Sequence, residues 1–224
     1  MLSRLLAMLL FVLALPACEA TDDAAEPDAS TAPSSCDEPA TQRVETFDIF
    51  TYEASRPDDG GPGACSRAGV PAWGTVTWDA ADAACDAIGW RLCTSAELLR
   101  ACGGPSGTMY TWGANFVGGL CNLREAYVAP GGEGRASAAP TGAFPECRSA
   151  EGIYDLTGNL WEWAADPPPG DPGGHAYQGA GWKTIAQLHH DESQACAQQT
   201  ALVAAFAATY ADDHVGFRCC RDAP

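Results

Sequence analysis

The hydrophobic pattern of the chain begins with an unbroken apolar run at residues 5–15, which Arg4 precedes. A run this short does not span a bilayer as a helix, and a basic residue before it is typical of a signal peptide. Residues 15–18 read Leu-Pro-Ala-Cys, typical of the lipobox of a bacterial lipoprotein, where the cysteine is acylated after cleavage. We expect a signal peptide at residues 1–17 and lipid on Cys18; the alternative is an ordinary secretory signal.

A polar stretch follows this segment. Residues 19–41 are rich in Ala, Asp, Glu, Ser, Thr and Pro and contain no aromatic residue, lysine or arginine. Such a composition does not bury enough apolar surface to order itself. We therefore expect a disordered acidic tether at residues 18–42, attached to a membrane through its lipid, and a single domain at residues 43–224.

Regular elements are predicted at only a few places in this domain. Residues 44–52 alternate between apolar and polar side chains, which predicts a strand, and residues 215–219 predict a closing strand. Thr77 is a favourable N-cap for a helix over residues 78–88, which Gly89 ends.

A second helix is predicted by the capping box of Thr94 and Glu97. It runs to Cys102 and ends at Gly103. Most of the remaining chain consists of turn-forming residues, with long Pro- and Gly-rich stretches at 57–63, 130–140 and 167–174. Long loops inside a domain carry function or need covalent support.

Charge and cysteine content narrow the class of protein. The formal net charge of −17 argues against nucleic acid as a partner. The chain has 11 cysteines, an odd number. If Cys18 carries lipid, ten remain to form disulfides in the oxidising compartment that export implies.

The most specific segment is residues 152–163, Gly-Ile-Tyr-Asp-Leu-Thr-Gly-Asn-Leu-Trp-Glu-Trp. It has a Thr-Gly-Asn turn between two oxygen donors, Asp155 and Glu162, and it ends in two tryptophans. Together with residues 216–220, Gly-Phe-Arg-Cys-Cys, it is more informative about the fold than about chemistry.

Several blocks in this order resemble the formylglycine-generating enzyme family, whose domains are also called sulfatase-modifying factors. The resemblance covers about residues 44–221 and implies an α+β, loop-rich, C-type-lectin-like fold that is cross-linked by disulfides. The blocks that carry it are residues 78–85, 89–97, 110–113, 139–140, 154–163, 179–182 and 216–219.

The resemblance also implies disulfides. The family's bridges correspond here to Cys85–Cys219 and Cys102–Cys196. Adjacent residues of a strand point to opposite faces, so Cys219 and Cys220 need different partners. Cys93 is the candidate partner of Cys220, Cys121 with Cys147 would close the long loop, and Cys36 with Cys65 remains by elimination. The sequence alone leaves the connectivity open, because ten cysteines allow very many pairings.

The family binds calcium at the segment that matches residues 155–162. Carried over, the ligands are the side chain of Asp155, the carbonyls of Gly158 and Leu160, and the carboxylate of Glu162. These are the oxygen donors that Ca²⁺ prefers. The alternative is that Asp155 and Asn159 only cap a turn and that Glu162 is exposed.

A second calcium site of the family would use the side chain of Asn122, the carbonyl of Leu123 and groups near Glu133 and Arg135. Only Asn122 matches this pattern without adjustment, so fewer matching residues support the second calcium site than the first.

The enzyme of the family oxidises a substrate cysteine to formylglycine with O₂ and copper, which two cysteines spaced Cys-x4-Cys hold. If Cys196 takes the structural position, the copper positions fall near Ala186 and Asp191; if Cys196 is the second copper cysteine, its partner position is Asp191. Either way the pair is absent, because the sequence contains no cysteine between Cys147 and Cys196. A two-sulfur copper site needs both thiolates. We therefore expect no copper-dependent formylglycine activity and no catalytic residues of that kind.

Other candidate chemistry is weaker. His189 and His190 lie beside Asp191 and Glu192, and relatives of the fold include iron-dependent sulfoxide synthases. Adjacent histidines of an extended chain point to opposite sides, however, so a solvated loop is the preferred interpretation. Residues 212–214, Asp-Asp-His, are interpreted as a turn with surface charges.

Two functions remain open. The first is a monomeric, non-catalytic binding or scaffold module at the cell envelope, whose ligand is a protein, a peptide or a glycan. The second is an oxidase of the formylglycine type or another metal-dependent oxygenase. Glu19 after the lipidated cysteine is compatible with sorting to an outer membrane. Four tryptophans could line a groove or belong to the core: Trp112, Trp161, Trp163 and Trp182.

Overall fold

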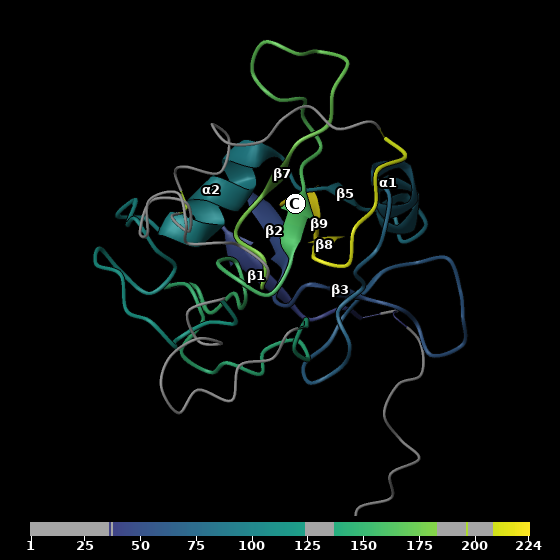
Figure 1. Cartoon of the computed structure of the whole chain (residues 1–224). Helices are drawn as coiled ribbons and strands as arrows, with labels where there is room; N and C mark the ends of the chain where they lie inside the picture. Colours follow the sequence, from purple (N-terminus) through teal and green to yellow (C-terminus); the bar gives the residue numbers. More distant parts are fainter. Residues whose placement is uncertain (1–35, 37, 124–136, 183–195, 197–207) are drawn as a thin grey trace, which may run out of the picture. The chain divides into compact units, whose positions relative to one another are not determined.

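The computed structural model describes residues 36, 38–123, 137–182, 196 and 208–224 (Figure 1). Helices and strands are short, and loops connect them. In chain order the elements are β1 (Thr41–Val44), β2 (Phe47–Phe50), β3 (Ala54–Ser55), β4 (Cys65–Ser66), α1 (Trp78–Asp86), β5 (Arg91–Leu92), α2 (Ser95–Gly103), β6 (Trp161–Trp163), β7 (Tyr177–Gln178), β8 (Val215–Phe217) and β9 (Cys219–Asp222).

The described strands form three small sheets. One has the order β1-β2-β9-β5 and is antiparallel throughout, and a second pairs β3 with β4. The third has the order β7-β6-β8, in which β8 runs parallel to β6. Because β8 and β9 belong to different sheets, the end of the chain joins two of them.

The predicted single strand over residues 44–52 is wrong. The structure has a hairpin there, in which Val44 of β1 pairs with Phe47 of β2. The two residues between them form the turn, and Glu45 has a φ of 51°. A two-residue hairpin turn needs such left-handed backbone, and without Asn or Gly at this position the sequence did not reveal it. β1 begins at Thr41, inside the stretch that we expected as tether.

The predicted closing strand over residues 215–219 is also wrong in its extent. The structure divides this segment into β8 and β9, which are separated by Arg218. The chain therefore changes sheets at one residue, and the side chain of that residue is fully buried.

Both helices occur where their caps predicted them. The Thr77 hydroxyl accepts a hydrogen bond from the N–H of Ala80, and α1 ends at Asp86, two residues before the predicted end. The N–H of Ile88 bonds to the carbonyl of Cys85 three residues back, so the last turn is tighter than α-helix. α2 has the full capping box of Thr94 and Glu97.

Two clusters of buried side chains position these elements. The apolar face of α1 packs with Phe50, Trp163 and Phe217, and the buried side of α2 packs with Ile153 and Leu156. No helix among the described residues is long and apolar enough to cross a membrane.

Five disulfides cross-link the described chain. They join Cys36 to Cys65, Cys85 to Cys219, Cys93 to Cys220, Cys102 to Cys196 and Cys121 to Cys147. These are the pairs named from the sequence. The adjacent cysteines of β9 reach α1 on one side and the residue after β5 on the other, so this strand is tied to both clusters.

Removing one of these bridges should destabilise the domain measurably. We expect the double variant Cys93→Ala/Cys220→Ala to lose about 2–4 kcal/mol of unfolding free energy, because the unfolded chain gains freedom. Denaturant titration measures this loss. Peptide mapping of the unreduced wild type provides the control, and recovery of different cysteine pairs would contradict the assignment.

Candidate functional site

The turn at residues 155–160 is built from unusual backbone conformations. Asp155 and Asn159 have φ values of 59° and 61°, and Gly158 has a φ of 101°. A Cβ atom on Gly158 would lie 3.0 Å from the carbonyl oxygen of Asn122, so a larger residue does not fit. Left-handed backbone therefore favours Gly158 and Asn159, and close packing requires the glycine.

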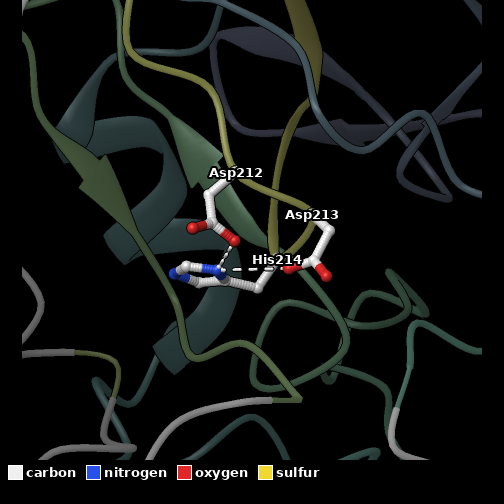
Figure 2. Close-up of side chains that lie close together, drawn as sticks. All are labelled: Asp212, Asp213 and His214. Carbon is white, nitrogen blue, oxygen red and sulfur yellow. Dashed lines mark hydrogen bonds and ion pairs between the residues drawn. The ribbon is translucent and has the colours of Figure 1, made fainter.

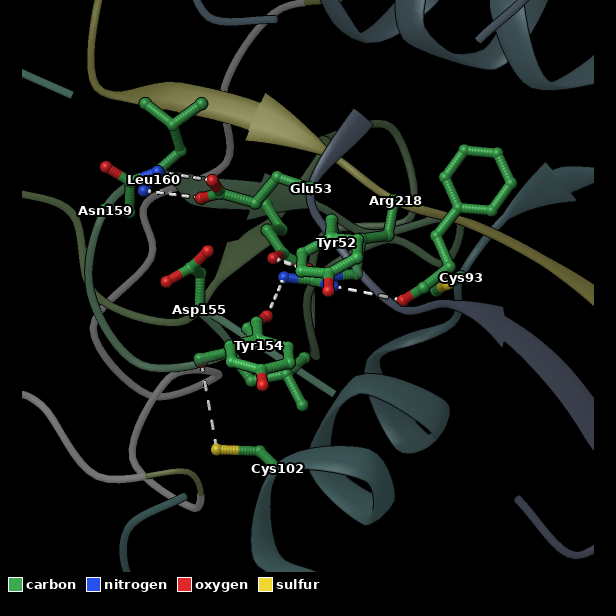
Figure 3. Close-up of polar contacts among 12 residues, drawn as sticks. Tyr52, Glu53, Cys93, Cys102, Tyr154, Asp155, Asn159, Leu160 and Arg218 are labelled. Atoms are coloured by element: carbon green, nitrogen blue, oxygen red, sulfur yellow. Dashed lines mark hydrogen bonds and ion pairs between the residues drawn. The ribbon is translucent and has the colours of Figure 1, made fainter. Parts of the chain in front are cut away.

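Asn159 is the polar centre of this turn. Its Oδ1 accepts hydrogen bonds from the N–H of Ala139 at 2.7 Å and from Nδ2 of Asn122 at 2.9 Å. Its Nδ2 donates to the carbonyl of Ala139 and to Oε2 of Glu53 (Figure 3). All four bonds of this amide are made within a buried environment, so Asn159 fixes the turn.

Glu53, which follows β2, reaches the turn from a distant part of the sequence. Its Oε1 accepts a hydrogen bond of 2.8 Å from the N–H of Leu160, and its side chain is fully buried (Figure 3). Burial, and next the charge of Asp155, raise the pKa of Glu53 well above its usual value. Both oxygens have partners, so we regard Glu53 as a brace for the turn.

Arg218 supplies the buried positive charge. Its Nε donates to Oε1 of Glu162 at 2.7 Å. Its other nitrogens donate to the carbonyl of Phe50 at 3.1 Å and to the carbonyl of Tyr154 (Figure 3). One side chain therefore bonds to β6, β2 and the start of the turn.

The buried charges do not balance. Glu53, Asp155 and Glu162 are at most 2 % exposed, and Arg218 is the buried cation beside them. With every carboxylate ionised, three negative charges would face one positive charge. Burial, as the largest cause, raises the pKa of Asp155 to about 6 and that of Glu162 to about 7. The cluster must therefore take up protons or a cation, because unpaired buried charge is costly.

Two side chains leave polar atoms unused at this place. Among the described residues, Oε2 of Glu162 and both amide atoms of Gln178 are buried without a hydrogen-bond partner. Gln178 lies directly opposite Glu162 in the β6–β7 ladder, so their side chains are on the same face. Unsatisfied buried atoms of this kind call for a water or an ion.

The predicted first calcium set can be compared with this geometry. Asp155 and Glu162 are both buried near Arg218, and Oδ2 of Asp155 accepts a hydrogen bond of 2.7 Å from the N–H of Gly142. The alternative in which Glu162 is exposed is wrong. Carboxylates with an unsatisfied oxygen and a nearby amide are donors of the kind that Ca²⁺ takes.

The second predicted set is only partly described. Asn122 and Leu123 are buried, and Nδ2 of Asn122 also donates to the carbonyl of Ser137 at 3.2 Å. Glu133 and Arg135 lie outside the described residues. The amide of Asn122 braces the turn at Asn159, and its role as a ligand stays a prediction.

One compact group of acidic and imidazole side chains lies at residues 212–214 (Figure 2). Nδ1 of His214 is 2.5 Å from Oδ1 of Asp212 and 3.7 Å from Oδ1 of Asp213. The backbone of the same turn bonds to Thr75 and Trp161. These contacts fit the predicted turn before β8. The histidine pair, His189 and His190, and the copper-aligned positions lie outside the described residues.

The four tryptophans do not line one groove. Trp163 is fully buried and donates from its indole N–H to the carbonyl of Val76, and Trp161 packs against the first core cluster. Trp112 lines a cavity of about 300 Å³ near the end of α2, and Trp182 is half-buried elsewhere.

Short helices, small sheets, five disulfides and a braced Gly-Asn turn define a loop-rich α+β domain of the formylglycine-generating-enzyme type. The model of the family described as "Sulfatase-modifying factor enzyme 1-like domain" matches residues 31–223, and the chain belongs to this family.

Relatives with printed names agree with this assignment. The chain is 33% identical over 156 residues to the inactive C-alpha-formylglycine-generating enzyme 2 of Mus musculus, covering 66% of this chain and 48% of the relative. It is 32% identical over 98 residues to the formylglycine-generating enzyme of Mus musculus, covering 41% of this chain and 26% of the relative. The chain thus spans at most about half the length of these relatives.

Solved structures show the same fold. PvdO from Pseudomonas aeruginosa superposes with a TM-score of 0.57 at 17% identity, covering 79% of this chain and 80% of that protein. Treponema denticola variable protein 1 superposes with a TM-score of 0.53 at 12% identity, covering 80% and 90%. At these identities the likeness extends to the fold alone.

Sequence reasoning missed three residues of the site. In the sequence, Arg218 stands out only as part of the motif at residues 216–220, and no motif contains Glu53 or Gln178. Glu53 carries no clear signal, because its burial depends on Leu160 and Asn159, which are distant in sequence. Gln178 carries no such signal, since only the strand register brings it opposite Glu162.

Replacing the buried guanidinium should destabilise the whole domain. We expect Arg218→Met to cost about 3–5 kcal/mol, because it leaves the buried carboxylate of Glu162 unpaired. Denaturant titration at neutral pH measures the loss.

The matched control is Arg221→Gln, in the same strand segment. Arg221 is half-exposed, bonds to Asp48 at 3.1 Å and lies over the ring of Trp90. Its replacement should cost about 1 kcal/mol. Equal losses for the two variants would show that burial of Arg218 has no special importance.

Proposed function

We propose that this chain is an exported, non-catalytic binding module with the fold of the formylglycine-generating enzyme. The observation that carries the proposal is the pairing of the cysteines in disulfides. Of the 11 cysteines, ten are paired in five disulfides and the remaining one is Cys18. The domain therefore offers no thiolate pair that could hold copper.

Two further findings support this function. Five disulfides are typical of a protein of an oxidising compartment. The two relatives that align over about two thirds of the chain, from Mus musculus and Bos taurus, are both named as inactive. The competing function is a formylglycine-type or other metal-dependent oxidase, which the similarity to the Mus musculus enzyme favours.

The two functions differ in metal content and in chemistry. The protein, purified after export with its disulfides intact, is incubated with copper, O₂ and a cysteine-containing sulfatase peptide. We expect no conversion of the cysteine by mass spectrometry and no stoichiometric copper by elemental analysis. Formylglycine in the peptide, or bound copper or iron at one per chain, would overturn the proposal.

We further propose that the buried cluster binds a structural calcium ion. Its ligands would be the carboxylates of Asp155 and Glu162 and the carbonyls of Gly158 and Leu160, with the amide oxygen of Gln178 as an additional donor. A divalent cation would offset the two excess negative charges of the cluster. The ion would link the turn to β6 and β7 and stabilise their relative position, without taking part in a reaction.

This calcium site predicts a characteristic pH dependence. Folding raises the pKa of Asp155 from 3.8 to about 6 and that of Glu162 from 4.5 to about 7. The folded protein therefore binds protons more tightly, and in chelator its unfolding free energy should fall as pH rises from about 4 to about 7. Millimolar calcium, which binds the ionised carboxylates, should abolish that fall, as calorimetry at several pH values would measure.

Variants separate calcium binding from general stability. Asp155→Asn with Glu162→Gln should remove the calcium-dependent melting shift, whereas the exposed Asp171→Asn should keep it. Gln178→Met should stabilise the chelated protein, because it removes an unsatisfied amide, and should weaken calcium binding. A wild-type protein whose melting does not respond to calcium at any pH would end the calcium hypothesis.

We propose, finally, that lipid on Cys18 anchors the domain to a membrane of the bacterial envelope, which can be the outer membrane. The lipobox sequence and the short apolar run support the anchor. Cys18→Ser should move the protein from the detergent phase to the aqueous phase in detergent partitioning and abolish labelling with a radioactive fatty acid. Equal partitioning of variant and wild type would argue for an ordinary secretory signal.

A further inference from the structure

A cavity of about 300 Å³ lies where α2 ends. Its size is at the lower limit of small-molecule sites, which are about 300–1,000 Å³. The turn after α2, the residues around Trp112 and residues 146–150 line it. None of the lining residues is a proposed calcium ligand, although Thr111 bonds to Thr157 of the neighbouring turn at 2.7 Å. The cavity is therefore a distinct candidate site beside that turn.

The walls of the cavity are rigid. A Cβ atom on Gly103 would lie 3.0 Å from the carbonyl oxygen of Thr108, and Gly104 has a φ of 63°. The tight turn after α2 therefore requires both glycines. The disulfide of Cys147 with Cys121 lies between the lining residues Glu146 and Arg148 and restrains that segment. A pre-formed site spends less free energy on ordering when a ligand binds.

Trp112 gives the cavity an aromatic wall. Its ring stacks on Tyr110 with a centroid distance of 5.1 Å and an interplanar angle of 7°. Its indole N–H donates to the carbonyl of Asn115 at 2.9 Å. Tyr110 covers one face of the indole, and Phe116 contacts the ring at a centroid distance of 6.2 Å. The ring also packs against the buried cluster around Cys121 and Cys147, so only the remaining part of its surface lines the cavity.

The mouth of the cavity has one acidic and one basic side chain. Glu146 and Arg148 are exposed residues on either side of buried Cys147, and in the described part of the chain neither has an ion-pair partner. Three residues with hydroxyl groups, Thr108, Thr111 and Ser149, also line the cavity. The site therefore offers hydrogen-bond acceptors and donors, and its formal charge sums to zero.

These features select a neutral, hydroxyl-rich ligand. The C–H face of a sugar ring packs on an indole, whose face is electronegative. Its hydroxyls both donate and accept, and so can bond to a carboxylate and a guanidinium at once. Anionic ligands are disfavoured by the net charge of −17. An added peptide strand needs a sheet edge, and no described strand lines the cavity.

We propose that this cavity is a binding site for neutral saccharides, with Trp112 as the stacking platform and Glu146 and Arg148 as the hydroxyl ligands. The inference rests on the proposed binding function, for which it names a site and a ligand class.

Saturation-transfer NMR and calorimetric titration of the exported protein test the proposal. The probes are the methyl glycosides of glucose, galactose, mannose and N-acetylglucosamine, with free glycine and tryptophan as zwitterionic comparisons. We expect at least one glycoside to bind, and we expect Trp112→Ala or Arg148→Gln to weaken it by roughly tenfold or more. Glu38→Gln, an exposed acid outside the cavity, should leave affinity unchanged.

Each outcome has a definite meaning. No binding of any glycoside by the wild type, or binding that survives both cavity variants with unchanged melting temperature, would overturn the saccharide site. Binding of the amino acids in preference to the glycosides would overturn the ligand class. These results are independent of the copper and peptide assay: a catalytically active chain would refute the proposed function, whereas a failed titration with no such activity would refute only the sugar site.

Discussion

The structure depends on one buried guanidinium. Arg218 stands between β8 and β9, where the chain passes from one sheet to another, and its nitrogens bond to Glu162, to Phe50 and to Tyr154. Sheets of two to four short strands have little cohesion of their own. Directed bonds from a single planar group set the relative position of β6, β2 and the turn at residues 155–160, with a specificity that apolar packing alone would not supply. The same guanidinium pairs with Glu162 and lowers the free-energy cost of burying that carboxylate. One ion pair therefore supports both the fold and the carboxylate cluster.

The sequence predicted the parts of this fold that local rules control. Thr77, Thr94 and Glu97 marked the helix starts because capping is a matter of neighbouring residues. It predicted poorly what depends on distant partners. Residues 44–52 predict one strand where the structure has a hairpin, and residues 215–219 predict one strand where it has β8 and β9. Period-two alternation does not reveal which sheet a strand joins. Glu53 and Gln178 escaped notice for the same reason, since their meaning comes from Leu160 and Glu162, more than ten residues away in sequence.

The family motif proved more informative about geometry than about reaction. Its turn uses left-handed backbone at Asp155 and Asn159 and a glycine against the carbonyl of Asn122, so those residue types are demanded by shape. The copper positions that the family resemblance implies fall in a different part of the sequence, where no cysteine lies between Cys147 and Cys196. Fold and reaction are separable in general, and the relatives of this chain include proteins named as enzymes and proteins named as inactive.

The two adjacent cysteines of β9 impose an order on the making of the protein. Their partners lie 134 and 127 residues earlier in the chain. A ribosome or an export channel delivers those partners first, so they must wait as free thiols until nearly all of the domain has emerged. The last strand, which also follows Arg218, then closes both clusters together. The two bridges of β9 therefore form late, after this strand has emerged, whereas Cys36–Cys65 and Cys121–Cys147 can close earlier.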